Sequence, residues 1–504
     1  MSNLAILGGE KTRTKPFSPW PLYSENDKAR LLEVLETRNW GGFPFPNRFA
    51  SEFAQKFADY HGAKYGCTLV NGTVALTVAL RAAGVKFGDE VIVPAYTWDG
   101  TATAVLDAGC VPIFADIHPD TYCLDVEDVR RRITPRTRAV MPVHLAMRFA
   151  DMDALLDLAR EKDLVVIEDA AHVHGGFYKG RGAGSMGDVG SFSLQTSKLM
   201  TSGEGGIVIT SRLDCYEMIQ SLVNCGRASE TDQFRKRPTG CNYRLSEFQA
   251  AVLLGQLEML PELTERRIRN AARLSEALAQ IPGIRPLPPQ PALTTEPIYC
   301  YVFQYRPTEP PSSAAVLLGQ LEMLPELTER RIRNAARLSE ALAQIPGIRP
   351  LPPQPALTTE PIYCYVFQYR PTEPPSSAPV PRDMFVAALD AEGVPSDGRF
   401  YDPVYRSDLF HASADDFPQL KLDRDEPVEY REFHCPVAER AAFHESVWLP
   451  QFVLLGDESD IDEIARAVDK VARNLGELEK ADPKLAALKS MSRAERPRIE
   501  KKNY

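Results

Sequence analysis

The run SFSLQTSKLMTSGEGG, residues 191–206, places Lys198 on a turn that ends in glycines. A second run, IEDAAHVHGG, starts at residue 167 and places Asp169 directly after the apolar stretch 164–167. The two residues are twenty-nine positions apart in the chain. A lysine amine can form a Schiff base, and a carboxylate can keep a pyridine nitrogen protonated. The pair therefore predicts pyridoxal phosphate chemistry.

The sequence around this pair alternates short apolar runs with helical stretches. Runs rich in Val and Ile predict buried strands at residues 91–93, 111–117, 140–145 and 164–167, and apolar spacing predicts helices over 73–83 and 152–160. This order predicts an α/β domain whose sheet is mostly parallel, with helices on both faces. Ligands of such sheets bind beyond the carboxyl ends of the strands, where Asp169 and Trp98 both fall.

Further candidate residues fit a cofactor with a phosphate and a flat ring. Gly72 and Thr73 start a predicted helix, and the exposed N–H groups of a helix start favour phosphate. Ser193 lies on a predicted strand, five residues before Lys198, and its hydroxyl could reach the same phosphate. Trp98 could lie against the ring, and His172 could bond its phenolic oxygen or steady Asp169. An ordinary helix cap and a core tryptophan are the alternatives at these positions.

Composition limits the class of protein. The chain has 504 residues, 44% of them hydrophobic, which suffices for two or three domains. A net charge of −10 argues against nucleic acid or an anionic membrane as the main partner. There is no apolar run of membrane-spanning length and no signal peptide, so we expect a cytoplasmic protein. Nine cysteines without a C-x-x-C pair favour reduced thiols, and His172 with His174 lacks a third metal ligand, so we expect no metal.

An identical internal repeat is the second main feature. Residues Ala250 to Ala314 recur without change from Ala314 to Ala378, at an offset of 64. Solenoid repeats keep only structural positions alike, so identity indicates a duplication laid upon a complete chain of 440 residues. Each copy predicts a helix (257–279 in the first) and a strand (298–306 and 362–370). We expect one copy to occupy the position that a single segment would have in the fold without the duplication. The sequence leaves open which of the two copies it is.

The predicted domain boundaries follow from these patterns. Residues 1–255 form a large cofactor-binding domain with an N-terminal arm. Residues 256–475 form a smaller C-terminal α/β domain that contains the duplication. Residues 476–504 form a charged tail that we expect to be partly disordered.

Six motifs occur together in order: NGTVAL, VPAYTW, PVHL with DMD, EDAAHVHG, SFSLQTSKLMTSGEGG and GCNYRLSEFQAAVL. The set resembles the DegT/StrS family of sugar and cyclitol aminotransferases, which have fold type I, over residues 15–475 less one repeat copy. The resemblance implies a large, mixed, mostly parallel sheet domain and a smaller C-terminal domain. It implies that Lys198 carries pyridoxal 5'-phosphate as a Schiff base and moves the proton, while Asp169 pairs with the pyridine nitrogen.

The same resemblance implies the other cofactor contacts. The phosphate would be held by Gly72, Thr73 and Ser193, with Trp98 covering the ring and His172 supporting it. Asn242 would reach the phosphate of the neighbouring subunit, which implies a homodimer with shared active sites. One departure is Arg148, which stands where small or uncharged residues are usual and so could affect the substrate pocket.

The retained lysine favours transamination, because family members that act as dehydratases typically have histidine there. The expected reaction moves an amino group from glutamine or glutamate to a keto-cyclitol or keto-sugar. PFSPWP and FHCPVAERAAFHESVWL look most like the glutamine:scyllo-inosose aminotransferases and the related amino-hydroxybenzoate synthases. Nucleotide-sugar aminotransferases are the alternative within the family. The alternative outside enzymes is a regulator or binding protein that the duplication has impaired.

Overall fold

The chain folds into two compact units. Unit 1 comprises Met1–Tyr305 and Pro381–Tyr504, and unit 2 comprises Arg306–Val380. The predicted tail lies outside the described residues, as does the second repeat copy apart from two short strands. The computed structural model describes residues 4–7, 9–42, 45–227, 240–305, 349–350, 367–368, 382–396, 401–407, 410, 412–422, 424, 426–450, 453 and 458–474.

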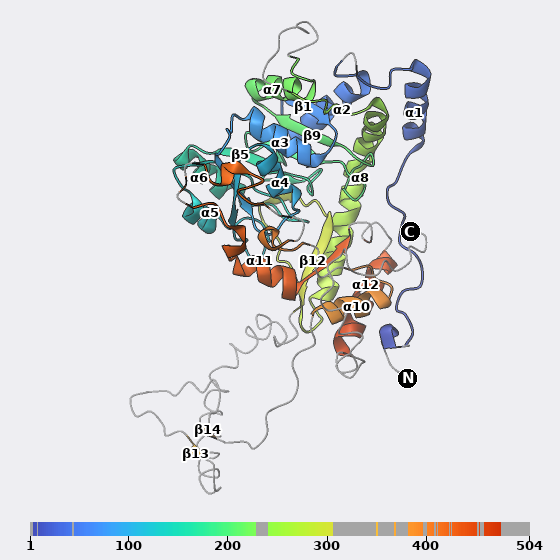
Figure 1. The fold of residues 1–504 in the computed structure, drawn as a ribbon. Coiled ribbons are helices and arrows are strands. Elements are labelled where there is room, and N and C mark those ends of the chain that lie inside the picture. The colour runs from blue at the N-terminus through green and yellow to red at the C-terminus, as the bar shows by residue number, and fades with distance from the viewer. Residues whose placement is uncertain are drawn as a thin grey trace. The chain divides into compact units, whose positions relative to one another are not determined.

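A seven-stranded sheet forms the centre of unit 1, in the order β1-β9-β8-β5-β4-β2-β3 (Figure 1). β9 runs antiparallel to both of its neighbours, and every other neighbouring pair is parallel. The expected mixed, mostly parallel sheet is therefore confirmed. Its strands are β1 (Tyr65–Leu69), β2 (Glu90–Pro94), β3 (Val111–Ala115), β4 (Thr137–Val140), β5 (Val165–Asp169), β8 (Val189–Ser193) and β9 (Gly206–Thr210).

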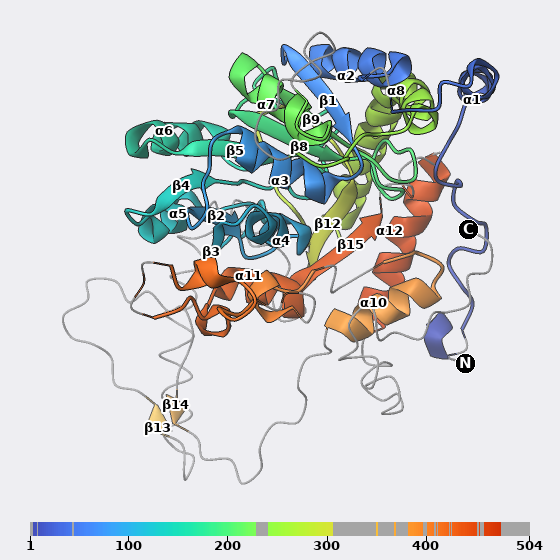
Figure 2. The same ribbon diagram turned by 45° about the horizontal axis from the view of Figure 1, so that its top comes forward.

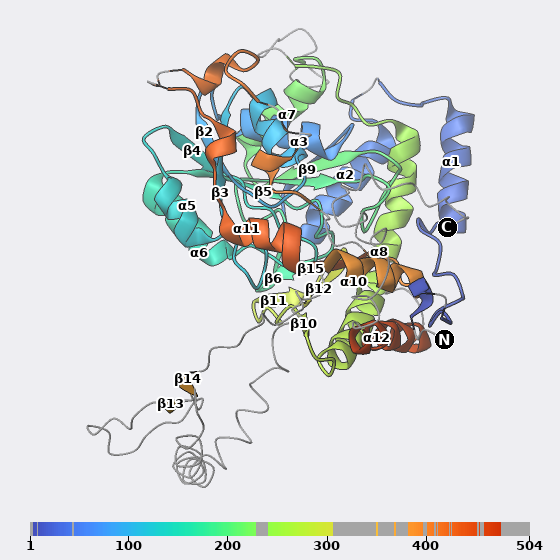
Figure 3. The same cartoon turned by 60° about the horizontal axis from the view of Figure 1, so that its bottom comes forward.

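Helices cover this sheet, and Figure 3 shows β2 and β4 between α3 on one side and the α5–α6 pair on the other. α2 illustrates why they pack, because Phe49, Phe53 and Phe57 recur at every fourth position and form one buried face against β1 and α8. The helices of this region are α1 (Glu25–Thr37), α2 (Arg48–His61), α3 (Gly72–Ala82), α4 (Gly100–Asp107), α5 (Val126–Arg132), α6 (Met152–Lys162) and α7 (Leu213–Val223).

One predicted strand was misplaced. The apolar run 140–145 predicted a strand, but β4 covers Thr137–Val140 and ends before Pro142. Proline has no N–H to donate, so it cannot continue a central strand. The carbonyl of Pro142 still accepts a 2.9 Å bond from the backbone N–H of Asp169, which keeps the following loop beside β5.

The first repeat copy is built into unit 1. Its helix α8 (Glu247–Leu278) starts ten residues before the predicted start at 257, because Ser246 and Gln249 form a capping box. Its strand β12 (Cys300–Tyr305) lies between β10 (Ile284–Pro286) and β15 (Ser446–Pro450), antiparallel to both. Figure 2 shows this small sheet beside α10 (Arg382–Ala391) and α12 (Glu458–Arg473). The boundary predicted at residue 255 falls inside α8 and stays a prediction.

Short elements complete the described part of the chain. β6 (Phe177–Tyr178), β7 (Arg181–Gly182) and β11 (Leu293–Thr295) form a three-stranded sheet. α11 spans Pro436–Arg440, and single helical turns occur at Ala5–Leu7, Val404–Arg406, Pro418–Leu420, Tyr430–Glu432 and Ala441–Glu445. In unit 2, β13 (Arg349–Pro350) pairs antiparallel with β14 (Phe367–Gln368). Within the described ranges, no helix combines the length and apolar character needed to cross a membrane.

Candidate active site

Asp169 ends β5 at the carboxyl edge of the large sheet. Its Oδ2 accepts a 2.9 Å hydrogen bond from the Thr101 hydroxyl, and its Oδ1 accepts one of 3.3 Å from the Ala171 N–H. Burial raises the pKa of the Asp169 carboxyl, while these two bonds and the nearby Lys198 charge oppose the rise. Asp169 is thus a buried acid whose charge depends on the groups placed around it.

Lys198 lies on the turn between β8 and β9. Its backbone N–H donates a 2.9 Å bond to the Gln195 carbonyl, and Thr196 bonds Gly203 across the turn. Part of the side chain reaches solvent, but the surrounding protein desolvates the amine and lowers the pKa of Lys198 to about 8, against the attraction of Asp169. The turn therefore presents an amine that loses its proton more easily than an ordinary lysine.

The start of α3 and the end of β8 lie side by side. A Cβ added to Gly72 would lie 2.7 Å from the Ser193 Cβ and 3.2 Å from its Oγ, so only glycine permits this approach. Asn71 caps the helix through a 2.9 Å bond from the Val74 N–H. The Thr73 hydroxyl lies 2.9 Å from the place of a Cβ on Gly100, where α4 begins. A helix start with two neighbouring hydroxyls fits a phosphate.

Trp98 follows β2 and keeps much of its surface open. Its side chain is 53% exposed, which is unusual for tryptophan and leaves a ring face available to a flat ligand. A Cβ on Gly100 would lie 2.7 Å from the Trp98 Cδ1, so this glycine permits the ring position. Tyr401 lies beside it, with ring centres 6.2 Å apart.

His172 is fixed by three groups. Its Nδ1 accepts a 3.2 Å bond from the Ala146 N–H, so Nε2 carries the proton and donates to the Tyr401 hydroxyl at 3.3 Å. The Tyr299 ring stacks on it, with centres 4.2 Å apart. Burial lowers the pKa of His172 well below its usual value, so the ring is neutral at pH 7. The described hydrogen bonds of His172 go to Ala146 and Tyr401 and do not reach Asp169.

Asn242 directly precedes Tyr243, whose carbonyl accepts a 3.0 Å bond from the Val70 N–H just after β1. It is exposed and forms an antiparallel bridge with Asn224. A role towards a neighbouring subunit stays a prediction.

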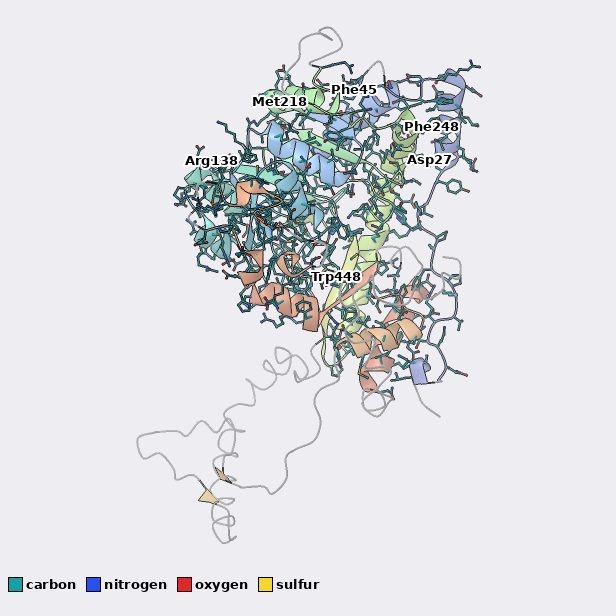
Figure 4. The ribbon with its side chains drawn as sticks, in the orientation of Figure 1. Asp27, Phe45, Arg138, Met218, Phe248 and Trp448 are labelled. Carbon is teal, nitrogen blue, oxygen red and sulfur yellow. The ribbon has the colours of Figure 1, made fainter. Side chains whose placement is uncertain are left out.

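Sequence reasoning missed three residues of this site. Thr101 lies two positions into α4 and bonds Asp169, and its place near YTW was the available signal. Tyr299 and Tyr401 come from distant segments with no motif around them. Tyr401 is brought in by the backbone, because Val404 donates a 2.8 Å bond to the Ala95 carbonyl. Figure 4 places Trp448 near the middle of unit 1, and its ring lies 6.4 Å from that of Tyr401.

His174 and Arg148, which the sequence also singled out, make contacts that stabilise the fold. His174 lies among aromatic rings, and the centre of its ring is 5.3 Å from that of Phe192. Burial lowers the pKa of His174 to about 3. No group of three or more potential metal ligands occurs within the described ranges. The Arg148 guanidinium bonds Glu296 and the carbonyls of Leu287 and Pro288, the last at 2.8 Å. Arg148 therefore fastens its loop to the first repeat copy, and its side chain is buried there.

Comparisons with known proteins identify the family of the chain. The profile of the DegT/DnrJ/EryC1/StrS aminotransferase family matches residues 23–310 and 303–469. A protein of Streptoalloteichus tenebrarius, provisionally named an L-glutamine:3-amino-2,3-dideoxy-scyllo-inosose aminotransferase, is 40% identical over 95% of this chain and 99% of its own. The L-glutamine:2-deoxy-scyllo-inosose aminotransferase of Streptomyces fradiae is 34% identical over 95% and 99%.

Solved structures share the fold. The crystal structure of 3-amino-5-hydroxybenzoic acid synthase matches with a TM-score of 0.68 and 29% identity, over 92% of this chain and all of the other. The expected fold type I is confirmed by this match and by the strand order of the large sheet.

Proposed function

Because the chain belongs to the DegT/DnrJ/EryC1/StrS aminotransferase family, we propose that it transfers an amino group from glutamine to a keto-cyclitol with pyridoxal phosphate. One observation carries the proposal: the Lys198 amine and the buried Asp169 carboxylate attract each other. Asp169 also bonds Thr101 at the start of α4, next to Thr73 at the start of α3. The acceptor follows from the names of relatives that are similar over nearly their whole length.

The residues present fit the cofactor. Gly72, Thr73 and Ser193 would hold the phosphate, because the helix start supplies N–H groups and the two side chains supply hydroxyls. Trp98 would cover the ring, since its face is open to a ligand. When bound, pyridoxal phosphate supplies an electron sink that stabilises the charge left by removal of a proton beside the amine.

Lys198 and Asp169 would have separate tasks. With a pKa of about 8, roughly one Lys198 amine in ten is neutral at pH 7, so the group can take up and return a proton near neutrality. Asp169 would hold a protonated ring nitrogen, which also favours the charged carboxylate that burial alone would suppress. The neutral His172 has one ring proton, on Nε2, and would donate it to the ring oxygen in place of the Tyr401 hydroxyl.

We also propose a homodimer in which Asn242 reaches the partner's phosphate, and a cytoplasmic location. The exposure of Asn242 in the single chain supports the first. For the second, the eight cysteines among the described residues are free thiols, as a reducing compartment would keep them.

The test is a substrate panel. Purified protein loaded with cofactor is incubated with glutamine or glutamate and with 2-deoxy-scyllo-inosose, 3-amino-2,3-dideoxy-scyllo-inosose or a nucleotide-linked keto-sugar. We expect a visible absorption band from the bound cofactor and amination of a keto-cyclitol with glutamine as donor. Amination of the nucleotide-linked sugar alone, or no amination at all, contradicts the proposal.

A further inference from the structure

Tyr299 lies in the site although it belongs to the duplicated segment. It directly precedes β12, and its backbone N–H donates a 3.0 Å bond to the carbonyl of Ala146, the residue whose own N–H bonds His172. The side chain is buried, with 5% of its surface exposed. Strand pairing on both sides of β12 thus fixes the backbone from which this ring projects.

Three contacts connect Tyr299 to the lysine turn and to His172. The Lys198 Nζ lies over the ring, 4.7 Å from its centre. The Tyr299 hydroxyl bonds the Ser197 Oγ at 2.8 Å, and Ser197 is the neighbour of Lys198 in the turn. The third partner is His172, whose ring stacks on that of Tyr299 with centres 4.2 Å apart and an angle of 29° between the planes. One side chain therefore touches the amine, its turn and the histidine.

We infer that Tyr299 is a positioning residue for the Lys198 amine, and that the first repeat copy is the one that supplies it. The inference rests on the proposed function. The ring face attracts the charged form of the amine, and the hydroxyl holds the turn that carries it. Because both contacts come from one rigid, strand-anchored side chain, they limit the positions that the amine can take.

The first copy is fastened to the site loop at further points. The Gln290 side chain both accepts from the Phe149 N–H at 3.0 Å and donates to the Phe149 carbonyl at 2.9 Å. Glu296 binds the buried Arg148 in the same loop. These bonds involve loop residues that occur once in the chain, so one copy at a time can make them.

The chain offers a matched control. Tyr363 is the counterpart of Tyr299 in the second copy, with the same residues on either side, IYCYVFQYR, and lies outside the described residues. We therefore compare Tyr299→Leu with Tyr363→Leu in the full chain. Turnover is measured as separate kcat and KM, together with the pH midpoint of the cofactor's visible absorption and the Tm.

We expect Tyr299→Leu to lower kcat roughly 3- to 30-fold and to lower the pH midpoint by roughly half a unit, because a positive charge loses an aromatic face. Tyr363→Leu should match the wild type in every measurement. A midpoint of Tyr299→Leu that is unchanged or raised overturns the role of Tyr299. Equal effects of the two variants overturn the assignment to the first copy.

A second pair of variants tests the inference if Tyr299→Leu fails to fold. Tyr299→Phe and Ser197→Ala each remove one end of the same hydroxyl–hydroxyl bond, so the double variant should be no worse than either single one. Additive losses in kcat contradict the inference. Wild-type protein that binds no cofactor and transfers no amino group contradicts the proposed function instead, which keeps the two failures distinct.

Discussion

The two copies of the duplicated segment share every residue, yet the structure gives their strands different neighbours. In the first copy, Arg285 pairs with Gln304 and Pro286 with Phe303. In the second, Arg349 pairs with Gln368 and Pro350 with Phe367, which is the same register displaced by 64 residues. The strand of the first copy also pairs with β15, whereas β13 and β14 form a two-stranded sheet.

The difference separates local from distant causes. The pairing that recurs in both copies needs only the residues of the segment itself. The third strand and the contacts with Arg148 and Phe149 need partners that occur once in the chain. Strand neighbours therefore depend on tertiary context, as strand propensity does in general. The segment also contains no lysine, aspartate or histidine, so the residues proposed to carry the chemistry have no second copy.

The largest expected effect is that of Lys198→Ala. Since the duplicated segment supplies no substitute lysine, turnover should be abolished while the fold persists. Amination assayed with added cofactor, and Tm as the control for folding, check this result. Wild-type turnover in the variant would show that the amine is not Lys198.

Asp169→Asn should have the second largest effect. The variant should retain some cofactor, and its kcat should be lowered about 100-fold or more. An amide cannot carry the negative charge that holds a protonated ring nitrogen, and the duplicated segment has no aspartate to replace it. Steady-state kinetics at saturating cofactor measure the loss. Near-normal rates would show that the Asp169 carboxylate has only a structural role, through its bonds with Thr101 and Ala171.

Gly255→Ala sharpens the comparison through stability, because Gly319 is its counterpart in the second copy. A Cβ on Gly255 would lie 1.8 Å from Oδ1 of the buried Asp27, where α1 meets α8 (Figure 4). We expect Gly255→Ala to lower the free energy of unfolding by about 1–3 kcal/mol through overpacking, and Gly319→Ala to leave the unfolding of unit 1 unchanged. Denaturant titration of both variants measures the difference, and equal losses would mean that both glycines face the same contact.

The pH dependence of stability should come from residues outside the duplication. Burial lowers the pKa of His61 to about 4 and that of His174 to about 3, against about 6.5 in the unfolded chain. The unfolded state therefore binds more protons below pH 6.5, and stability falls as the pH drops from there towards 4, by up to about 1.4 kcal/mol per histidine and pH unit. Urea titrations at pH 7 and 5 test this. A flat profile would show that these rings are not sealed from water.

The sequence predicted the fold well and the site only where local signals exist. Asp169 and Ser193 end the parallel strands β5 and β8, and Lys198 follows on the glycine turn, so the rule for parallel sheets predicts that they lie at the same edge. Tyr299 and Tyr401 enter through tertiary contacts between segments that are far apart in the chain. Arg148 likewise gave no sign that Glu296 and two carbonyls would surround it. The early end of β4 could have been read from Pro142.

Deletion of Ala315 to Ala378 tests the central claim most directly, namely that unit 1 with the first copy is a complete enzyme. The deletion joins Ala314 to Pro379 and leaves 440 residues, including every proposed site residue. We measure kcat/KM for amination of a keto-cyclitol by the full and the shortened chain under the same conditions. The account predicts that the shortened chain is at least as active. A shortened chain that is folded but inactive, or that does not fold, would contradict it.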